Sequence, residues 1–505
     1  MLNRWIAAFA VGLALALPMR ASAQRADNSL TWGFSTDIET LDPYGTAKRT
    51  VQLVIRNVLE HLLYRDPKTG EARPALATSW AWIDDKTLQF TLRRGVTFHD
   101  GQPFDADDVV YTLQYIKSPD AQISFGQSDY GFLDRAEKVD AFTVRLILKM
   151  PTPSAIDRLT QTLFMLPHVA HAKMGAKAFG LHPIGTGPYK VSTFEPGRGL
   201  ELARYDGYHE AQWGKPRLDK IKVVTLPNAQ TQLAELTSGR VDFLWGISND
   251  QMQQLQGAKG VTAIAGGSTS VSFLSLDAAG RSGANPMQDK NVRLAIAHAI
   301  NRAAISQVLL GGSSVVIDAP CHPKQFGCPA PAATYDYDVA KAKEALKASA
   351  YPSGFETQIA AFTDGGPVAE AIIGDLREIG IKAKLDFRET SAWIKDFFGG
   401  KLQASIVPWP SNGVYDVSAL VPLFFMGDQG DYARDPEVIS WFRQAGSITD
   451  AAERSRLYKL GFDKIEREEY VVPLMTGVTN YGFREGLDFT PPADGYPLMY
   501  MTGWK

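Results

Sequence analysis

Helical stretches that lead directly into a strand recur along the chain, and this alternation constrains the fold more than any other feature. Residues 367–379 have a proline in the first turn and end at Gly380, and residues 381–387 then alternate polar and apolar. Residues 231–238 and 241–245 repeat the arrangement. Alternation on this scale favours lobes of the α/β class, in which helices pack on sheets.

Three further segments carry a clear periodicity. Residues 51–63 place apolar side chains at the spacing of a one-sided helix, and residues 87–92 alternate as a half-buried strand does. Residues 291–310 read as one long helical stretch that ends at Gly311 and Gly312. We therefore expect helices and strands in both halves of the chain.

Length and charge limit the class of protein. The chain has 505 residues, which at roughly 100–200 residues per domain predicts about three structural units. It is 45% hydrophobic and 21% charged, as globular proteins are. Lys and Arg total 52 against 55 Asp and Glu, and no long basic run occurs. Because phosphate binding needs a concentrated positive face, we expect no nucleic-acid partner.

The N-terminal segment, residues 1–23, has the three parts of a secretory signal peptide. Arg4 supplies the positive charge, residues 5–17 contain no charge, and residues 21–23 read Ala-Ser-Ala, an A-x-A cleavage site. The alternative, an amphipathic or buried helix, explains less of this pattern. The apolar run is too short to span a bilayer, and no cysteine near the cleavage site suggests a lipid anchor. We expect an exported, periplasmic protein.

The two cysteines, Cys321 and Cys328, lie in a proline-rich stretch without helical or strand periodicity. In an oxidising compartment such a close pair predicts a disulfide that constrains a loop. The alternative is a metal site that uses both thiolates and His322, which would need a fourth ligand from elsewhere.

Catalytic signatures are absent from the sequence. It contains no Gly-x-Ser-x-Gly, no Walker phosphate loop, no Gly-x-Gly-x-x-Gly and no His-Glu-x-x-His. The spacing of His168 and His171 could place both rings on one helical face, but no carboxylate follows closely. Asp107 and Asp108 fit the first turn of a helix better than an acid/base pair. We expect no catalysis, no cofactor and no bound metal.

A series of motifs resembles one known family. Residues 88–110 read LQFTLRRGVTFHDGQPFDADDVV, and residues 183–189 read PIGTGPY. Leu41-Asp42-Pro43 precedes them, and residues 292–302, 335–342 and Pro473-Leu474 follow in the family's order. In these motifs the chain closely resembles the family 5 extracellular solute-binding proteins of ABC importers, which include dipeptide, oligopeptide, glutathione and nickel binders. The resemblance covers essentially the whole mature chain.

The resemblance implies a two-lobed α/β fold of the periplasmic-binding-protein type with an extra domain inserted in the first lobe. The predicted units are a signal peptide (1–23), a first lobe (24–275) with an inserted subdomain at about 70–185, a second lobe (276–482) and a C-terminal return to the first lobe (483–505). Such a protein encloses a solute between its lobes by hinge closure and passes it to a membrane permease. We expect a monomer.

The resemblance also suggests ligand contacts. A Trp-containing segment near the end of the second lobe lines the cavity in the family, and residues 407–416 match it here. Trp409 and Tyr415 are the candidates for aromatic walls, with core packing as the alternative. Tyr44, just after the Leu-Asp-Pro motif, is a weaker candidate from the first lobe.

The chain departs from the dipeptide binders at both charged anchors. Those proteins hold the peptide's α-amino group with an aspartate shortly after the matching tryptophan. This chain has Asn412 there, with Asp416 further along as a second candidate or a capping residue. They hold the carboxylate with an arginine before a helix of the second lobe, but residues 362–367 contain none. Asp364 in that segment either faces a cationic group or is a turn residue.

These departures bear on the solute. A buried charged terminus without a counter-charge costs on the order of several kcal/mol, so a strict dipeptide mode is not expected unless other residues replace the anchors. The aromatic segment also lacks the histidine expected of nickel binders. We expect a peptide or peptide-like small solute. The alternatives are an opine, an amino-acid conjugate, a saccharide or a metal complex, or else an exported peptide-binding chaperone or hydrolase.

Overall fold

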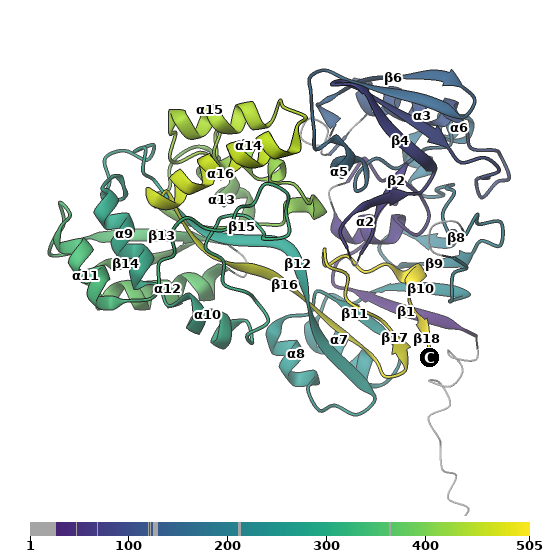
Figure 1. Cartoon of the computed structure of the whole chain (residues 1–505). Coiled ribbons are helices and arrows are strands. Elements are labelled where there is room, and N and C mark those ends of the chain that lie inside the picture. The colour runs from purple at the N-terminus through teal and green to yellow at the C-terminus, as the bar shows by residue number, and fades with distance from the viewer. Residues whose placement is uncertain are drawn as a thin grey trace, which may run out of the picture.

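The computed structural model describes residues 27–46, 48–67, 69–119, 121, 123–124, 130–210, 214–362 and 365–505. The predicted signal peptide, residues 1–23, lies outside these ranges. The described chain forms two lobes (Figure 1). Within this part of the chain, no helix has both the length and the apolar character needed to cross a membrane.

One ten-stranded sheet runs through both lobes (Figure 1). Its strands follow in the order β14 (Lys382–Phe387), β13 (Glu356–Ala361), β15 (Ala404–Trp409), β12 (Val261–Leu276), β16 (Val471–Arg484), β11 (Phe243–Trp245), β1 (Ser29–Phe34), β10 (Lys220–Thr225), β9 (Gly199–Arg204) and β8 (Tyr189–Glu195). The first three belong to the second lobe and the last five to the first.

The two central strands, β12 and β16, join the lobes. They pair antiparallel from Val261 opposite Arg484 to Ser275 opposite Val471. The register shifts between Gly267 and Val271, so the ladder is irregular part of the way along. The chain therefore passes between the lobes within paired strands rather than through loose linkers.

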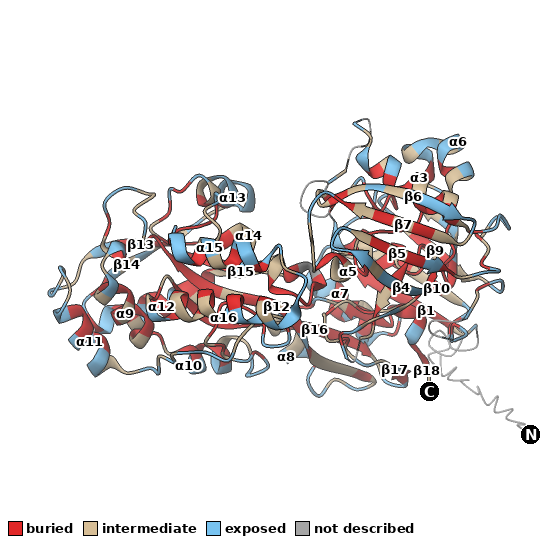
Figure 2. Ribbon diagram, turned by 45° about the horizontal axis from the view of Figure 1, so that its top comes forward, coloured by how far each residue is buried: buried red, intermediate tan, exposed pale blue. Residues whose placement is uncertain are grey.

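A separate antiparallel sheet lies in the first lobe, with the order β4 (Ala77–Asp84), β5 (Thr87–Leu92), β7 (Thr143–Leu148), β6 (Leu133–Asp140). The buried residues alternate along β5 and β7, as expected for strands with one face in the core (Figure 2). Helix α3 (Ala106–Lys117) packs on this sheet, and α6 (His168–Phe179) packs on α3. The sheet falls inside the predicted insertion at about 70–185. The predicted domain boundaries stay a prediction.

In the second lobe, helices cover both faces of the sheet. Two neighbouring residues of β15 point to opposite faces of the sheet and so enter different cores. Ile406 packs with α9 (Lys290–Ala299) and α12 (Gly365–Glu378), whereas Val407 packs with aromatic residues of α13–α16. The remaining helices are α10 (Arg302–Leu309), α11 (Val339–Lys347), α13 (Thr390–Phe398), α14 (Val421–Phe424), α15 (Pro436–Ala445) and α16 (Ala451–Arg467).

The elements that flank the first lobe's part of the large sheet are short. They are α2 (Arg49–Ile55), β2 (Leu63–Arg65), β3 (Ala72–Pro74), α5 (Ala155–Leu159), α7 (Ala229–Thr237), α8 (Asn249–Leu255), β17 (Leu487–Asp488) and β18 (Gly503–Trp504). The segment after β16 returns to the first lobe, where the indole N–H of Trp504 donates to the Ser29 carbonyl at 2.9 Å.

Several predicted elements are confirmed. Strand β5 spans residues 87–92 as predicted. Helix α12 and strand β14 reproduce the predicted helix and strand, and Gly380 between them has φ +94°. A positive φ of this size is one that glycine adopts without strain, so the helix ends there.

The predicted helix 51–63 is wrong in its second half. Helix α2 ends at Ile55, and Leu63 already belongs to β2. The Asn57 side chain donates to the carbonyls of Leu53 and Val54, which takes acceptors from the end of the helix. The apolar residues that follow are buried in the first-lobe core without being helical, so their periodicity misled the prediction.

The predicted single helix 291–310 is also corrected, because it is two helices. Helix α9 ends at Ala299, and Ile300 is extended with ψ 117°. The Asn301 side chain accepts from the Ala304 backbone N–H at 3.0 Å and so begins α10. This local cap interrupts a pattern that is otherwise continuous in the sequence.

Candidate functional site

The lobes meet where β2 and α5 of the first lobe face the segment that follows β15. The guanidinium carbon of Arg65 lies 4.7 Å from the ring centroid of Tyr415. A Cβ atom on Gly413 would lie 3.1 Å from the Gln161 side chain. The second-lobe segment predicted to line a cavity therefore lies at the interlobe boundary.

Charged groups from both lobes gather at this boundary. Arg65 pairs with Asp157 in the first lobe, and Arg454 pairs with Asp416 at 2.8 Å in the second. Arg158 donates across the boundary to the Ser418 carbonyl at 3.2 Å. Burial raises the pKa of Asp157 and Arg65 lowers it, while the facing Asp416 raises it further. Opposed carboxylates are thus each compensated by an arginine.

Trp409 stands at the end of β15, half-buried. Its ring meets that of Phe424 edge to face at a centroid distance of 5.3 Å. Its Nε1 atom is buried and has no hydrogen-bond partner among the described residues. One side of this indole therefore packs on the second-lobe core, while its N–H has capacity left for a further acceptor.

Tyr415 is 9% exposed, and its ring is held between the lobes. A Cβ atom on Gly70 would lie 2.7 Å from this ring, so only a residue without a side chain allows the close contact. Burial raises the pKa of Tyr415 to about 12, so the phenol stays protonated at neutral pH.

The structure places Tyr44 in the core of the first lobe. Its hydroxyl donates to the Phe164 carbonyl at 2.6 Å, and its ring contacts those of Tyr115 and Tyr130. Burial raises its pKa well above the usual value. These contacts give Tyr44 a packing role.

Asp416 is a helix-capping residue, which was the alternative to a ligand contact. Its Oδ1 accepts from the Ser418 N–H at 2.8 Å, at the start of the short helix η3 (Val417–Ala419), and its Oδ2 accepts from Arg454. Asn412 belongs to the short helix η2 (Ser411–Gly413), but its side chain lies outside the described part of the structure. Asp364 lies outside the described residues altogether.

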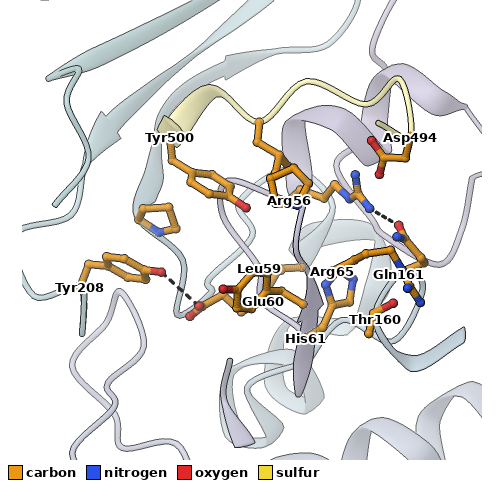
Figure 3. A pocket seen from close by; sticks show the side chains of 14 residues that line it. Arg56, Leu59, Glu60, His61, Arg65, Thr160, Gln161, Tyr208, Asp494 and Tyr500 are labelled. Atoms are coloured by element: carbon orange, nitrogen blue, oxygen red, sulfur yellow. Dashed lines mark hydrogen bonds between the residues drawn. The ribbon is translucent and has the colours of Figure 1, made fainter. Parts of the chain in front are cut away.

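The structure also shows a hollow in the first lobe, close to the interlobe boundary, that the sequence did not reveal. It is small, with about 40 Å³ of space for water-sized molecules, and it opens to solvent on one side (Figure 3). We call it the inner chamber, and it is lined by Arg56, Leu59, Glu60, His61, Tyr64, Arg65, Pro67, Thr160, Gln161, Pro188, Tyr208, Asp494, Leu498 and Tyr500. These residues come from segments far apart in the chain, so no local pattern could have predicted the chamber.

Hydrogen bonds between polar side chains hold the wall of the inner chamber in place. The Arg56 guanidinium donates to Gln161 Oε1, and the Tyr208 hydroxyl points at Glu60 (Figure 3). Burial and the nearby Arg56 lower the pKa of His61 to about 3, so this ring is neutral at physiological pH. The chamber adjoins the boundary because Gln161, one of its lining residues, also faces Gly413.

Buried polar atoms remain unsatisfied on both sides of the boundary. In the first lobe these are His61 Nε2, Arg65 Nε and Gln161 Nε2, and in the second Trp409 Nε1, Ser411 Oγ and Ser418 Oγ, none of which has a partner within the described ranges. Buried polar groups in folded proteins are nearly always hydrogen-bonded. A concentration of exceptions at one boundary is typical of a site that binds a polar molecule.

The cysteines and histidines form no metal site within the described parts of the chain, where no three His, Cys, Asp or Glu residues come together. Instead, His168 Nδ1 lies 2.8 Å from Asp108, and His171 Nδ1 lies 2.7 Å from the Tyr111 hydroxyl. The sulfur atoms of Cys321 and Cys328 are 1.99 Å apart, as in a disulfide.

Comparison with known proteins shows that the chain is similar to one family along most of its length. The family model for bacterial extracellular solute-binding proteins, family 5, matches residues 71–431. The chain is 29% identical over 494 residues to the glutathione-binding protein GsiB of Salmonella paratyphi A, covering 94% of this chain and 93% of that one. It is 26% identical over 485 residues to GsiB of Escherichia coli O157:H7, with 92% of each chain covered.

Solved structures agree. HbpA2 from Haemophilus parasuis superposes with a TM-score of 0.83 at 23% identity, covering 95% of this chain and 100% of that one. AgaA from A. tumefaciens R10, solved with agropinic acid, gives 0.73 at 25% identity over 94% and 99% of the two chains. The fold is the two-lobed α/β fold of these proteins. The chain belongs to family 5 of the bacterial extracellular solute-binding proteins, which are binding proteins rather than enzymes.

Proposed function

We propose that this protein captures a peptide or peptide-like small solute between its lobes and delivers it to the permease of an ABC importer. One observation carries the proposal. Unsatisfied buried polar atoms from the first lobe (Gln161, Arg65) and from the second (Trp409, Ser411) converge on the same boundary. A solute that bonds to both sets stabilises the closed arrangement, because it gains contacts that neither lobe offers alone.

The chemistry of the walls supports a peptide-like solute. Trp409 is half-buried and offers aromatic surface beside the buried Tyr415 ring, whereas Gln161 and Arg65 offer hydrogen-bond donors. Amide-containing molecules with apolar and carboxylate parts match such a mixture. The relatives named glutathione-binding proteins, and a neighbour solved with the peptide STSA at a TM-score of 0.73, bind molecules of this kind.

Export and delivery complete the proposal. Residues 1–23 direct the chain out of the cytoplasm and are removed. The mature protein acts as a monomer in the periplasm. Closure bends the paired strands β12 and β16 near the irregularity between Gly267 and Val271. The permease then recognises the closed, loaded form.

The experiment is native mass spectrometry of the mature protein, purified from the periplasm without refolding and then denatured to release bound solute. A thermal-shift panel with glutathione, Met-Leu, a tetrapeptide and agropinic acid follows. A ligand at about one hundred times its Kd stabilises the folded state by about 2.7 kcal/mol, which such a panel detects. A released peptide-like molecule, or a shift with glutathione or a peptide, supports the proposal. A shift with agropinic acid alone, or none at all, contradicts it.

A further inference from the structure

We propose that the inner chamber of the first lobe binds a carboxylate group of the solute, while the remainder of the solute lies against Trp409 and Tyr415. The inference rests on the proposed function and names the chemistry of one end of the solute. It is drawn from the charges and the hydrogen-bond donors of the chamber wall.

The chamber contains two guanidinium groups and two carboxylates, and the carboxylates already have partners. Glu60 lies 3.0 Å from His209 Nε2 and 3.4 Å from the Tyr208 hydroxyl. Asp494 accepts from the Tyr496 N–H at 3.0 Å, and burial raises its pKa while Arg56 and Arg65 lower it. The acids of the chamber are therefore committed to protein groups.

Apart from the neutral His61 ring, whose Nε2 is also unsatisfied within the described residues, the free polar atoms of the chamber wall are donors. Arg56 donates to Gln161 Oε1, which fixes the amide so that Gln161 Nε2 is the free end. Arg65 donates through its terminal nitrogens to Asp157 and to the Gly70 carbonyl, and its Nε is left without a partner in the described part of the chain. Gln161 and Arg65 are 7% and 8% exposed, so both donors are buried groups.

A carboxylate satisfies this wall better than a cation or a neutral group. Buried donors beside a guanidinium favour an anionic oxygen, and charge-assisted hydrogen bonds of this kind are about twice as strong as neutral ones. In the second lobe, residues 362–367 contain no arginine that could hold a carboxylate. The counter-charge comes from the first lobe instead.

The test compares acids with matched neutral derivatives. The probes are glutathione with its diethyl ester, and Met-Leu with Met-Leu amide, measured by titration calorimetry on the dialysed mature protein. The key variant is Gln161→Glu, which keeps the size of the side chain and its bond to Arg56 but replaces the free donor with a negative oxygen. Arg240→Gln is the control, because Arg240 forms an exposed ion pair with Glu235.

We expect an acid to bind at least tenfold more tightly than its neutral derivative. Gln161→Glu should weaken binding of the acid at least tenfold and leave binding of the neutral derivative within a factor of three, and Arg240→Gln should change neither. Equal binding of acid and derivative, or an unchanged affinity of Gln161→Glu for the acid, overturns the chamber's role but leaves the proposed function standing. Binding of no probe contradicts both.

Discussion

Trp409 is the residue at which the second-lobe core and the proposed site meet, because its ring packs on Phe424 and its Nε1 is unsatisfied. Trp409→Ala should weaken solute binding by about 1–3 kcal/mol through loss of an aromatic wall. Trp409→Phe keeps a ring against Phe424 and should lose less. Titration calorimetry with the solute released from the native protein measures both. Wild-type affinity in Trp409→Ala, in a variant with an unchanged circular dichroism spectrum, would make Trp409 a core residue only.

Glu466 makes the stability of the second lobe depend on pH. It is 3% exposed, its Oε2 accepts from the Ala332 N–H at 2.6 Å, and burial raises its pKa to about 7. Burial also raises the pKa of the nearby Glu469. A folded-state pKa above the unfolded value means that the folded protein binds more protons, so stability is greatest at low pH in this window and falls as pH rises towards 7.

Glu466→Gln should lower, by about one, the number of extra protons that the folded state binds relative to the unfolded state. The pH slope of the free energy of unfolding should therefore decrease by up to about 1.4 kcal/mol per pH unit between pH 5 and 7. The variant should be more stable than the wild type at pH 8 and close to it at pH 5. Urea unfolding at these two pH values is the measurement. The same pH slope in both proteins would show that Glu466 does not titrate in this range.

Single residues differ in how far the sequence reveals them. Asp108 lies in the first turn of α3, as predicted, and both halves of its capping box with Asp105 lie within four residues of the sequence. Gln161, His61 and Asp494 carry no local signal, because they line the inner chamber only after distant segments have packed together. Their role follows from tertiary structure alone.

Among the elements, the loop closed by Cys321 and Cys328 supports the proposed site. The Phe326 N–H donates to the Tyr415 carbonyl at 2.7 Å, and Gln325 Nε2 donates to the Val414 carbonyl at 2.9 Å. The loop between the cysteines therefore fixes the backbone that carries Tyr415.

Replacing both cysteines, Cys321→Ser with Cys328→Ser, should lower the free energy of unfolding by about 2–3 kcal/mol, as the chain-entropy model gives for a short loop. Solute binding should weaken as well, since the loop positions the segment 414–416. Chemical denaturation and calorimetry measure the two effects. A mass increase of two hydrogens on reduction of the wild type should accompany them, and two thiols that alkylate without reductant would contradict the disulfide.

Periodicity predicted the elements well only where nothing local competed with it. Strands β5 and β14 and helix α12 follow their patterns because each contributes an alternating or one-sided face to a core. The boundary between α9 and α10 was missed because the cap made by Asn301 is a stronger local determinant than the apolar repeat around it. The motif series predicted the fold class, which single elements could not.

At the scale of the whole molecule, the large sheet has a consequence for how the protein unfolds. Strands β12 and β16 are hydrogen-bonded to each other in both lobes, from Val261 opposite Arg484 to Ser275 opposite Val471. If one lobe unfolded alone, β12 and β16 would separate in that lobe, and the hydrogen bonds between them would break part of the way along both strands. We therefore expect one calorimetric endotherm for the apoprotein, with equal calorimetric and van't Hoff enthalpies. Two resolved endotherms would show that the lobes unfold separately.

The same continuity bears on biogenesis. The first-lobe sheet needs β16 beside β11, and β16 is among the last strands to leave the ribosome. The N-terminal half cannot complete its sheet until almost the whole chain has been made, so this sheet keeps an unpaired edge during synthesis. On the proposed export of the chain, this order delays closure of the fold until the C-terminal strands arrive.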